Sequence, residues 1–156
     1  MADGMGHIFQ INASNGGVPK RAVREADVTA LGLTGDAVEH PKIHGGPERA
    51  LCLFALERIV ALQAEGHPIF PGSVGENITV AGVDWARVVP GAQLRLGDRV
   101  LIEVTRYTTP CATIAGSFAD GNSNRILQTE HEGWARVYAR VLETGRIRVG
   151  ERVRLM

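Results

Sequence analysis

Cys111 is the residue whose type and position most strongly suggest chemistry. It follows Pro110 at the end of the β-branched run VTRYTT (residues 104–109). Proline ends strand pairing, and loops at strand ends often carry functional side chains. A thiolate there would be a nucleophile or a soft metal ligand, and nearby Arg106 would favour the ionised form. The alternative is a structural cysteine, because free cysteine is among the most buried residue types.

The second cysteine, Cys52, predicts core packing rather than chemistry. It stands between leucines in ALCLF (residues 50–54). The chain has no C-x-x-C motif and one plausible thiolate, so we expect no zinc site. Without a recognisable export signal, two cysteines predict free thiols rather than a disulfide.

Three short motifs could supply a ligand site. HGGPER (44–49) and GSVGEN (72–77) contain glycines, which allow a backbone to approach a ligand closely or to make a tight turn. Glu76 and Asn77 could hold a ligand or hydrogen-bond the loop backbone. The basic pair in PKRAV (19–23) is an anion-binding candidate or solvated surface. None of these motifs matches a Walker A loop or a dinucleotide fingerprint.

Composition limits the class of protein. The 156 residues are 44% hydrophobic, with 17 basic and 17 acidic side chains, so the formal net charge is zero. This size and composition predict one domain, residues 1–156. Neutrality favours neither nucleic acid nor an anionic membrane as a partner, although a small anion needs only local donors. No signal peptide or membrane span is recognisable, which predicts a cytoplasmic protein.

The elements that must position these residues are mostly strands. Nineteen glycines punctuate short apolar runs, which is typical of a β-rich domain. We expect strands in residues 6–14, 77–82 and 99–109. LRLGDRVLI (94–102) and IRVGERVRL (147–155) resemble each other, and each predicts a strand, a glycine-centred bend and a second strand. Helices are expected over 55–65 and 123–132, while 133–143 fits either a strand or a helix.

The order of these motifs resembles the MOSC family, the domains named after the C-terminal part of molybdenum cofactor sulfurases. The resemblance runs from about Ile8 to Leu155, and its most specific elements are HGGPERA, GENITV and TTPC. It implies a mainly β (β-rich α+β), barrel-like domain with a few short helices. It also implies a cysteine at the mouth of a cleft that binds the molybdenum–pterin cofactor.

The resemblance assigns roles to particular residues. Cys111 matches the cysteine that ligates molybdenum in amidoxime-reducing members and is proposed to carry a persulfide in sulfurase members, so it is the expected catalytic and metal-binding residue. Lys20, His44, Arg49 and Arg106 are the expected donors to the pterin phosphate. Asn77 and Thr79 could bind the edge of the pterin.

Three functions fit this resemblance. The first is a molybdenum-dependent oxidoreductase that reduces N-hydroxylated small molecules, such as hydroxylaminopurines or amidoximes. Two cysteines cannot hold a four-thiolate cluster, so an external flavin or iron–sulfur reductase would supply the electrons. The second is a persulfide sulfur carrier that works with a cysteine desulfurase, and the third is a non-catalytic cofactor-binding module. Exposed edge strands could support a homodimer.

Overall fold

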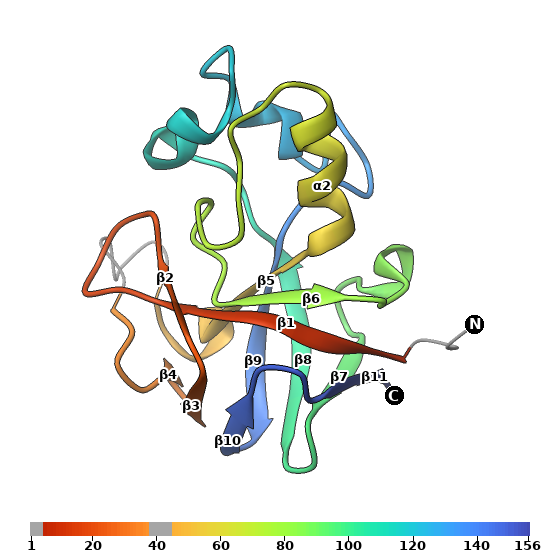
Figure 1. Ribbon diagram of the computed structural model, residues 1–156. Coiled ribbons are helices and arrows are strands. Elements are labelled where there is room, and N and C mark those ends of the chain that lie inside the picture. The colour runs from red at the N-terminus through yellow and green to blue at the C-terminus, as the bar shows by residue number, and fades with distance from the viewer. Residues whose placement is uncertain (1–4, 38–44) are drawn as a thin grey trace.

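The computed structural model describes residues 5–37 and 45–156, so the predicted cofactor-binding residue His44 lies outside the described residues. Strands outnumber helices in the described chain and make up most of its regular secondary structure (Figure 1). The strands are β1 (Met5–Ala13), β2 (Arg21–Val23), β3 (Glu25–Thr29), β4 (Gly32–Leu33), β5 (Leu51–Ala55), β6 (Ile78–Ala81), β7 (Gln93–Leu96), β8 (Val100–Tyr107), β9 (Val137–Glu143), β10 (Gly145–Arg148) and β11 (Arg152–Leu155).

Seven of these strands close into a barrel. Their order is β11-β7-β8-β9-β5-β6-β1, and β1 pairs with β11 to complete the ring. β5 and β6 run parallel, whereas the other neighbours in the ring are antiparallel. β2 extends the sheet from the far end of β1, and β10, β3 and β4 form a separate three-stranded sheet. The expected mainly β, barrel-like fold is therefore confirmed.

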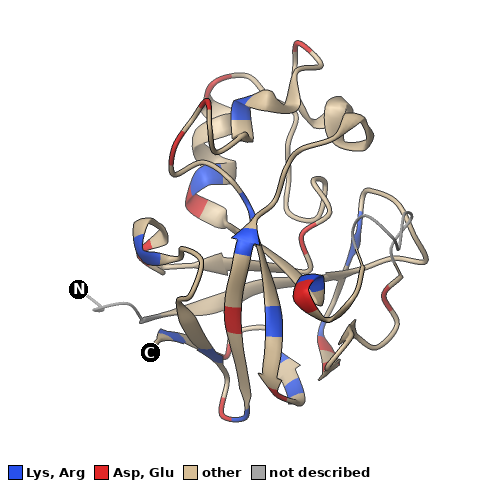
Figure 2. Ribbon diagram, turned by 180° about the vertical axis from the view of Figure 1, so that it is seen from behind, with Lys and Arg blue, Asp and Glu red and all other residues tan. Residues whose placement is uncertain are grey.

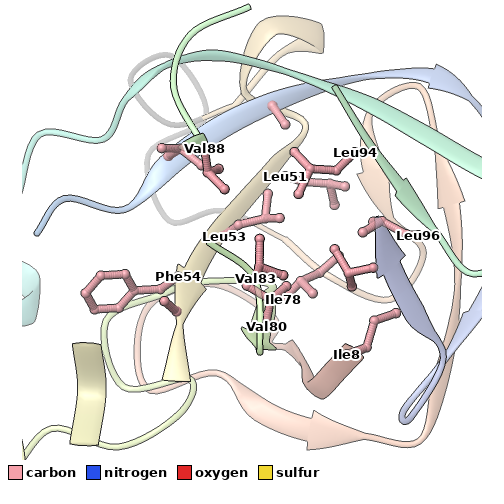
Figure 3. Close-up of a cluster of buried hydrophobic side chains, with 14 of the residues drawn as sticks. Ile8, Leu51, Leu53, Phe54, Ile78, Val80, Val83, Val88, Leu94 and Leu96 are labelled. Carbon is pink, nitrogen blue, oxygen red and sulfur yellow. The ribbon is translucent and has the colours of Figure 1, made fainter. Parts of the chain in front are cut away.

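Aliphatic side chains fill the barrel (Figure 3). The fully buried ones include Ile8 from β1, Leu51 and Leu53 from β5, Ile78 from β6 and Leu94 from β7. Burying a side chain of this size contributes about 1.5–3 kcal/mol. All five residues of β5 are buried, including the cysteine within it.

The predicted helix over 55–65 is present as α2 (Leu56–Ala64), which buries Ile59 and Leu62. It ends before Gly66, whose positive φ of 100° reverses the chain. Figure 1 shows α2 at one end of the barrel, beside the segment of residues 112–126. No helix in the described part of the chain is long and apolar enough to cross a membrane.

The other helix prediction, over 123–132, is wrong. Only Ser123–Ile126 is helical, as a short 3₁₀ turn begun by Asn122, whose side chain accepts a hydrogen bond from the Asn124 backbone N–H. Turns follow it because the segment buries only Ile126 of its apolar residues, which gives a longer helix no face to pack. The described chain has further 3₁₀ turns at Pro47–Arg49, Trp85–Arg87 and Ala112–Ser117.

The two similar segments do form strand, bend and strand, with Gly97 and Gly150 at positive φ. β7 and β8 pair with each other as a hairpin. β10 and β11 instead separate, because β10 pairs with β3 and β11 completes the barrel. The ambiguous segment 133–143 becomes strand β9 from Val137 onward.

Candidate functional site

A cavity of about 330 Å³ lies where the loops around one end of β5 and β9 meet. This is within the range of small-molecule sites, about 300–1,000 Å³. Its walls are formed by some of the residues in each of six segments, 17–20, 31–37, 45–52, 74–77, 109–114 and 136–138. Both HGGPER and GSVGEN therefore contribute to the same cavity as the cysteine loop, although their sequences are far apart.

Cys111 lines this cavity and is half-buried. β8 ends at Tyr107, and the loop that follows carries the cysteine, as the position of Pro110 predicted. Its Sγ lies 2.7 Å from Thr113 Oγ1. Its carbonyl oxygen accepts from the Ile114 N–H (3.3 Å) and from Ser123 Oγ (3.4 Å). The 3₁₀ turns after the cysteine thus anchor its backbone.

Cys52 is buried, as predicted, but it also contributes to the cavity wall. It pairs across the sheet with Tyr138 of β9, and its Sγ lies 3.7 Å from Thr108 Oγ1. Burial raises the pKa of the Cys52 thiol and also that of the Tyr138 phenol. Both groups therefore stay protonated at neutral pH. The two cysteines are free thiols, as expected.

Lys20 and Asn77 line the cavity and share one carboxylate, Asp36. Lys20 Nζ lies 2.7 Å from Asp36 Oδ1, and Asn77 Nδ2 donates to Asp36 Oδ2 over 2.8 Å. Asn77 Oδ1 accepts from the Cys52 N–H at 2.9 Å, and the Ser14 N–H donates to Asp36 Oδ1 at 2.9 Å. Asp36 therefore fixes two of the predicted binding side chains. Sequence reasoning missed it because its partners are distant in the chain.

Glu76 and Thr79 stand behind the cavity wall rather than in it. Thr79 is fully buried and is not among the lining residues. Its hydroxyl donates to Glu76 Oε2 over 3.0 Å, and the same oxygen accepts from the Gly72 N–H at 3.0 Å. Burial raises the pKa of Glu76, which favours its neutral form. Thr79 and Glu76 shape the 72–77 loop, and the cavity gives no support for Thr79 as a pterin contact.

The two other predicted cations differ in position. Arg49 ends the Pro47–Arg49 turn, lines the cavity and lies 5.7 Å from the centre of the Tyr138 ring. Arg106 lies on β8, is exposed and is not among the lining residues. A binding role for Arg106 therefore stays a prediction without support from the cavity.

Sequence reasoning also missed Arg136. It lines the cavity, is only 5% exposed and donates from Nη1 to the Val74 carbonyl oxygen over 2.6 Å. The Thr108 N–H donates to the Arg136 carbonyl oxygen at 2.9 Å, so Arg136 is joined to the start of the cysteine loop. The only signal in the sequence was an arginine among apolar residues in a segment whose secondary structure was ambiguous.

The donor set fits an anionic ligand that carries a thiophilic metal. Among the described residues, no group of three or more His, Cys, Asp or Glu side chains could hold a metal ion. Cys111 can offer one soft sulfur, and further ligands would have to arrive with the metal. Lys20, Arg49 and Arg136 supply positive charge in the same cavity. Elsewhere, acidic and basic positions are interspersed along the ribbon rather than gathered by sign (Figure 2).

The fold and this cavity define a β-barrel protein with a cysteine-bearing ligand site. The model of the MOSC domain family matches residues 40–154, which is more than half of the chain. The chain therefore belongs to the MOSC domain family, as its motifs predicted. The matched region contains Cys111, Arg49, Asn77 and Arg136, whereas Lys20 and Asp36 precede it.

Curated relatives extend the match toward the N-terminus. The chain is 30% identical over 142 residues to the uncharacterized protein YflK of Bacillus subtilis (strain 168), covering 90% of this chain and 63% of YflK. It is 31% identical over 115 residues to protein YiiM of Escherichia coli (strain K12), covering 70% of this chain and 51% of YiiM. A protein of Gibberella moniliformis (strain M3125 / FGSC 7600) named reductase is 32% identical over 134 residues, covering 82% of this chain and 23% of the reductase. The chain spans less than two thirds of each relative.

Solved structures share the fold. The crystal structure of a hypothetical protein superposes with a TM-score of 0.76 at 25% identity, covering 96% of this chain and 68% of that one. The crystal structure of YiiM from Escherichia coli gives a TM-score of 0.72 at 24% identity, covering 97% of this chain and 69% of the YiiM chain.

Proposed function

We propose that this MOSC protein binds the molybdenum–pterin cofactor in the cavity and reduces N-hydroxylated small molecules, with the Cys111 thiolate as the ligand of molybdenum. One observation carries the proposal. A half-buried cysteine and three cationic side chains, Lys20, Arg49 and Arg136, line the same cavity. The Gibberella relative named reductase supports an oxidoreductase over the other functions of the family.

Different side chains of the cavity would bind different parts of the cofactor. Cys111 would bind the metal through sulfur, a soft donor. The cations would hold the phosphate, and Asn77, fixed by Asp36, would present its amide to the pterin. His44 stays a predicted contact. When bound, the cofactor supplies the two-electron chemistry that cleaves an N–O bond.

The protein residues prepare the site for this chemistry. The Thr113 hydroxyl lies within hydrogen-bond distance of Cys111 Sγ, and it must be the donor once the sulfur is a thiolate. The apolar residues Val18, Leu31 and Leu33 also line the cavity, so part of its wall would give a bound ligand apolar contact. An external flavin or iron–sulfur reductase would supply the electrons.

The test is turnover by protein purified from a host that makes the cofactor. A hydroxylamine or an amidoxime is incubated with the protein and a chemical electron donor, and the amine or amidine product is measured. We expect turnover by wild type and by the exposed control Asp98→Asn, and at least about a hundredfold less by Cys111→Ala. Molybdenum-loaded protein that shows no turnover with any donor would contradict the reductase. A gain of one sulfur atom at Cys111 after incubation with a cysteine desulfurase would indicate a sulfur carrier instead.

A further inference from the structure

Leu31 is an apolar side chain that lines the cavity and is nevertheless 72% exposed. No other large hydrophobic side chain in the described part of the chain is more exposed. The apolar lining residues Leu33, Val74 and Ile114 differ from it, because they are at most 5% exposed and belong to the hydrophobic core. Leu31 therefore offers apolar surface that the described chain does not cover and that a ligand in the cavity can cover.

The turn that carries Leu31 is fixed on both sides. β3 and β4 pair as a hairpin outside the barrel, with Thr29 opposite Gly32 (Figure 1). Thr29 Oγ1 accepts from the Leu31 N–H over 3.2 Å and donates to the Gly32 carbonyl oxygen over 3.1 Å. Gly32 has a φ of +123°, and a Cβ there would collide with the carbonyl oxygen of Ala50, another lining residue. Leu31 is thus held at the edge of the cavity before a ligand arrives, which reduces the entropy lost on binding.

The surroundings of Leu31 indicate the chemistry of the group that would contact it. Ala30 and Gly32, its neighbours in the turn, carry no polar side chain. In the proposed arrangement the metal, phosphate and pterin go to Cys111, the cations and Asn77, which leaves the apolar lining residues for the rest of the ligand. Contact between apolar surfaces is favourable, whereas a polar group placed against a leucine loses hydration without gaining a hydrogen bond. The group against Leu31 should therefore be apolar.

We infer that Leu31 contacts an apolar group of the substrate and makes the protein prefer N-hydroxylated compounds with a large apolar substituent over those with a small one. The inference rests on the proposed function and deepens it, because the bound cofactor supplies the chemistry at the N–O bond while Leu31 discriminates between substituents. Leu31 can donate neither a hydrogen bond nor a proton. It is a specificity-determining residue that changes how tightly the substrate binds.

The first test compares two amidoximes that differ only in their substituent, benzamidoxime with a phenyl group and acetamidoxime with a methyl group. Protein from a host that makes the cofactor is assayed with a chemical electron donor. We expect Leu31→Ala to raise the KM for benzamidoxime at least about fivefold, because apolar contact is lost. The KM for acetamidoxime and both kcat values should change less than about twofold.

Two further variants separate this contact from a general effect of substitution. Leu31→Met should keep the wild-type preference, because methionine is apolar and of similar volume. Leu142→Ala should match wild type with both substrates, since Leu142 is an exposed leucine of β9 that is not among the lining residues. Equal changes in KM for the two substrates in Leu31→Ala, or no change for either, would overturn the inference.

Folding is checked by thermal unfolding of each variant. Leu31 is mostly exposed, so Leu31→Ala should unfold at the same temperature as wild type. If it unfolds at a lower temperature, Leu31→Gln replaces it, because glutamine keeps a long side chain but is polar. A selective rise in the KM for benzamidoxime in folded Leu31→Gln supports the inference, and the wild-type preference in that variant refutes it.

Binding is measured separately, so that failure of the proposed function can be distinguished from failure of the inference. Benzamide and acetamide are neutral analogues of the two amidoximes and contain no N–O bond. Each is titrated into isotope-labelled protein, with and without cofactor, and the backbone N–H resonances of residues 29–33 are followed by nuclear magnetic resonance. We expect saturable shifts with benzamide, and at least about fivefold weaker binding of benzamide in Leu31→Ala.

The outcomes of this titration decide the role of Leu31 without turnover. Wild type that shows no saturable shift at residues 29–33, or that binds benzamide no more tightly than Leu31→Ala does, would overturn the inference. Cofactor-loaded protein that reduces neither amidoxime would contradict the proposed function, while the benzamide titration would still show whether Leu31 contacts an apolar ligand.

Discussion

Lys20 Nζ and Asp36 Oδ1 lie 2.7 Å apart in the cavity wall, and their side chains are only 7% and 9% exposed. The pair shows that the cations of the site differ in whether a carboxylate of the chain lies beside them. The charge of Lys20 is compensated within the chain, whereas that of Arg136 has no carboxylate partner in the described part. The cavity can therefore hold one basic group in a fixed position while another attracts an anionic ligand.

Replacing Asp36 should cost far more stability than replacing a surface carboxylate. Asp36→Asn leaves the Lys20 ammonium buried without a counter-charge, and we expect the free energy of unfolding to fall by about 3–5 kcal/mol. Urea unfolding at neutral pH measures this change. The control is Asp27→Asn, which breaks an exposed ion pair with Arg146 and should cost about 1 kcal/mol or less. Similar losses in the two variants would show that burial does not strengthen the Lys20–Asp36 pair.

Gly72 should tolerate no side chain. Its φ is +90°, and a Cβ there would collide with the Lys20 carbonyl oxygen and approach the Asn12 amide. We expect Gly72→Ala to lower the free energy of unfolding by more than about 3 kcal/mol, through strain and close contact together. Gly121→Ala is the matched control, since Gly121 also has a positive φ (+71°) but has open space around it. Thermal unfolding with equal losses for both would contradict the close approach.

Glu76 should make stability depend on pH in a defined direction. Burial raises the pKa of Glu76 in the folded state above the ordinary value of 4.5. The stability that the protonated carboxyl group contributes is therefore complete below about pH 4.5 and is lost as the pH rises through the raised pKa. Wild type should therefore lose stability relative to Glu76→Gln as pH increases, by up to about 1.4 kcal/mol per pH unit. Urea unfolding between pH 4 and 8 tests this. The exposed Glu130→Gln should leave the wild-type pH dependence unchanged. Parallel curves for wild type and Glu76→Gln would contradict the burial effect.

Much of the fold could be predicted from the sequence because local patterns encode it. Ile59 and Leu62 at helical spacing, followed by Gly66, predicted α2, and the run ending before Pro110 predicted β8. The separation of β10 from β11 could not be predicted, because the same local pattern forms a hairpin at β7 and β8. The choice depends on which strands complete the barrel, and that is a tertiary effect.

The site was only partly predictable for a related reason. Cys111, Arg49 and Asn77 stand in motifs that a family resemblance could point to, and the structure places all three around one cavity. Arg136 carries no such signal, because its importance comes from burial without a carboxylate partner. Asp36 is recognisable only once Lys20, which is 16 residues away in the chain, is placed beside it.

The central claim is that the Cys111 sulfur holds the metal. The most direct test measures molybdenum by mass spectrometry in wild type and Cys111→Ser, both purified from a host that makes the cofactor. We expect wild type to retain molybdenum and Cys111→Ser to retain at least about tenfold less, since an alcohol is a poor substitute for a soft thiolate ligand. Equal molybdenum in the two proteins, or none in wild type, would contradict the account.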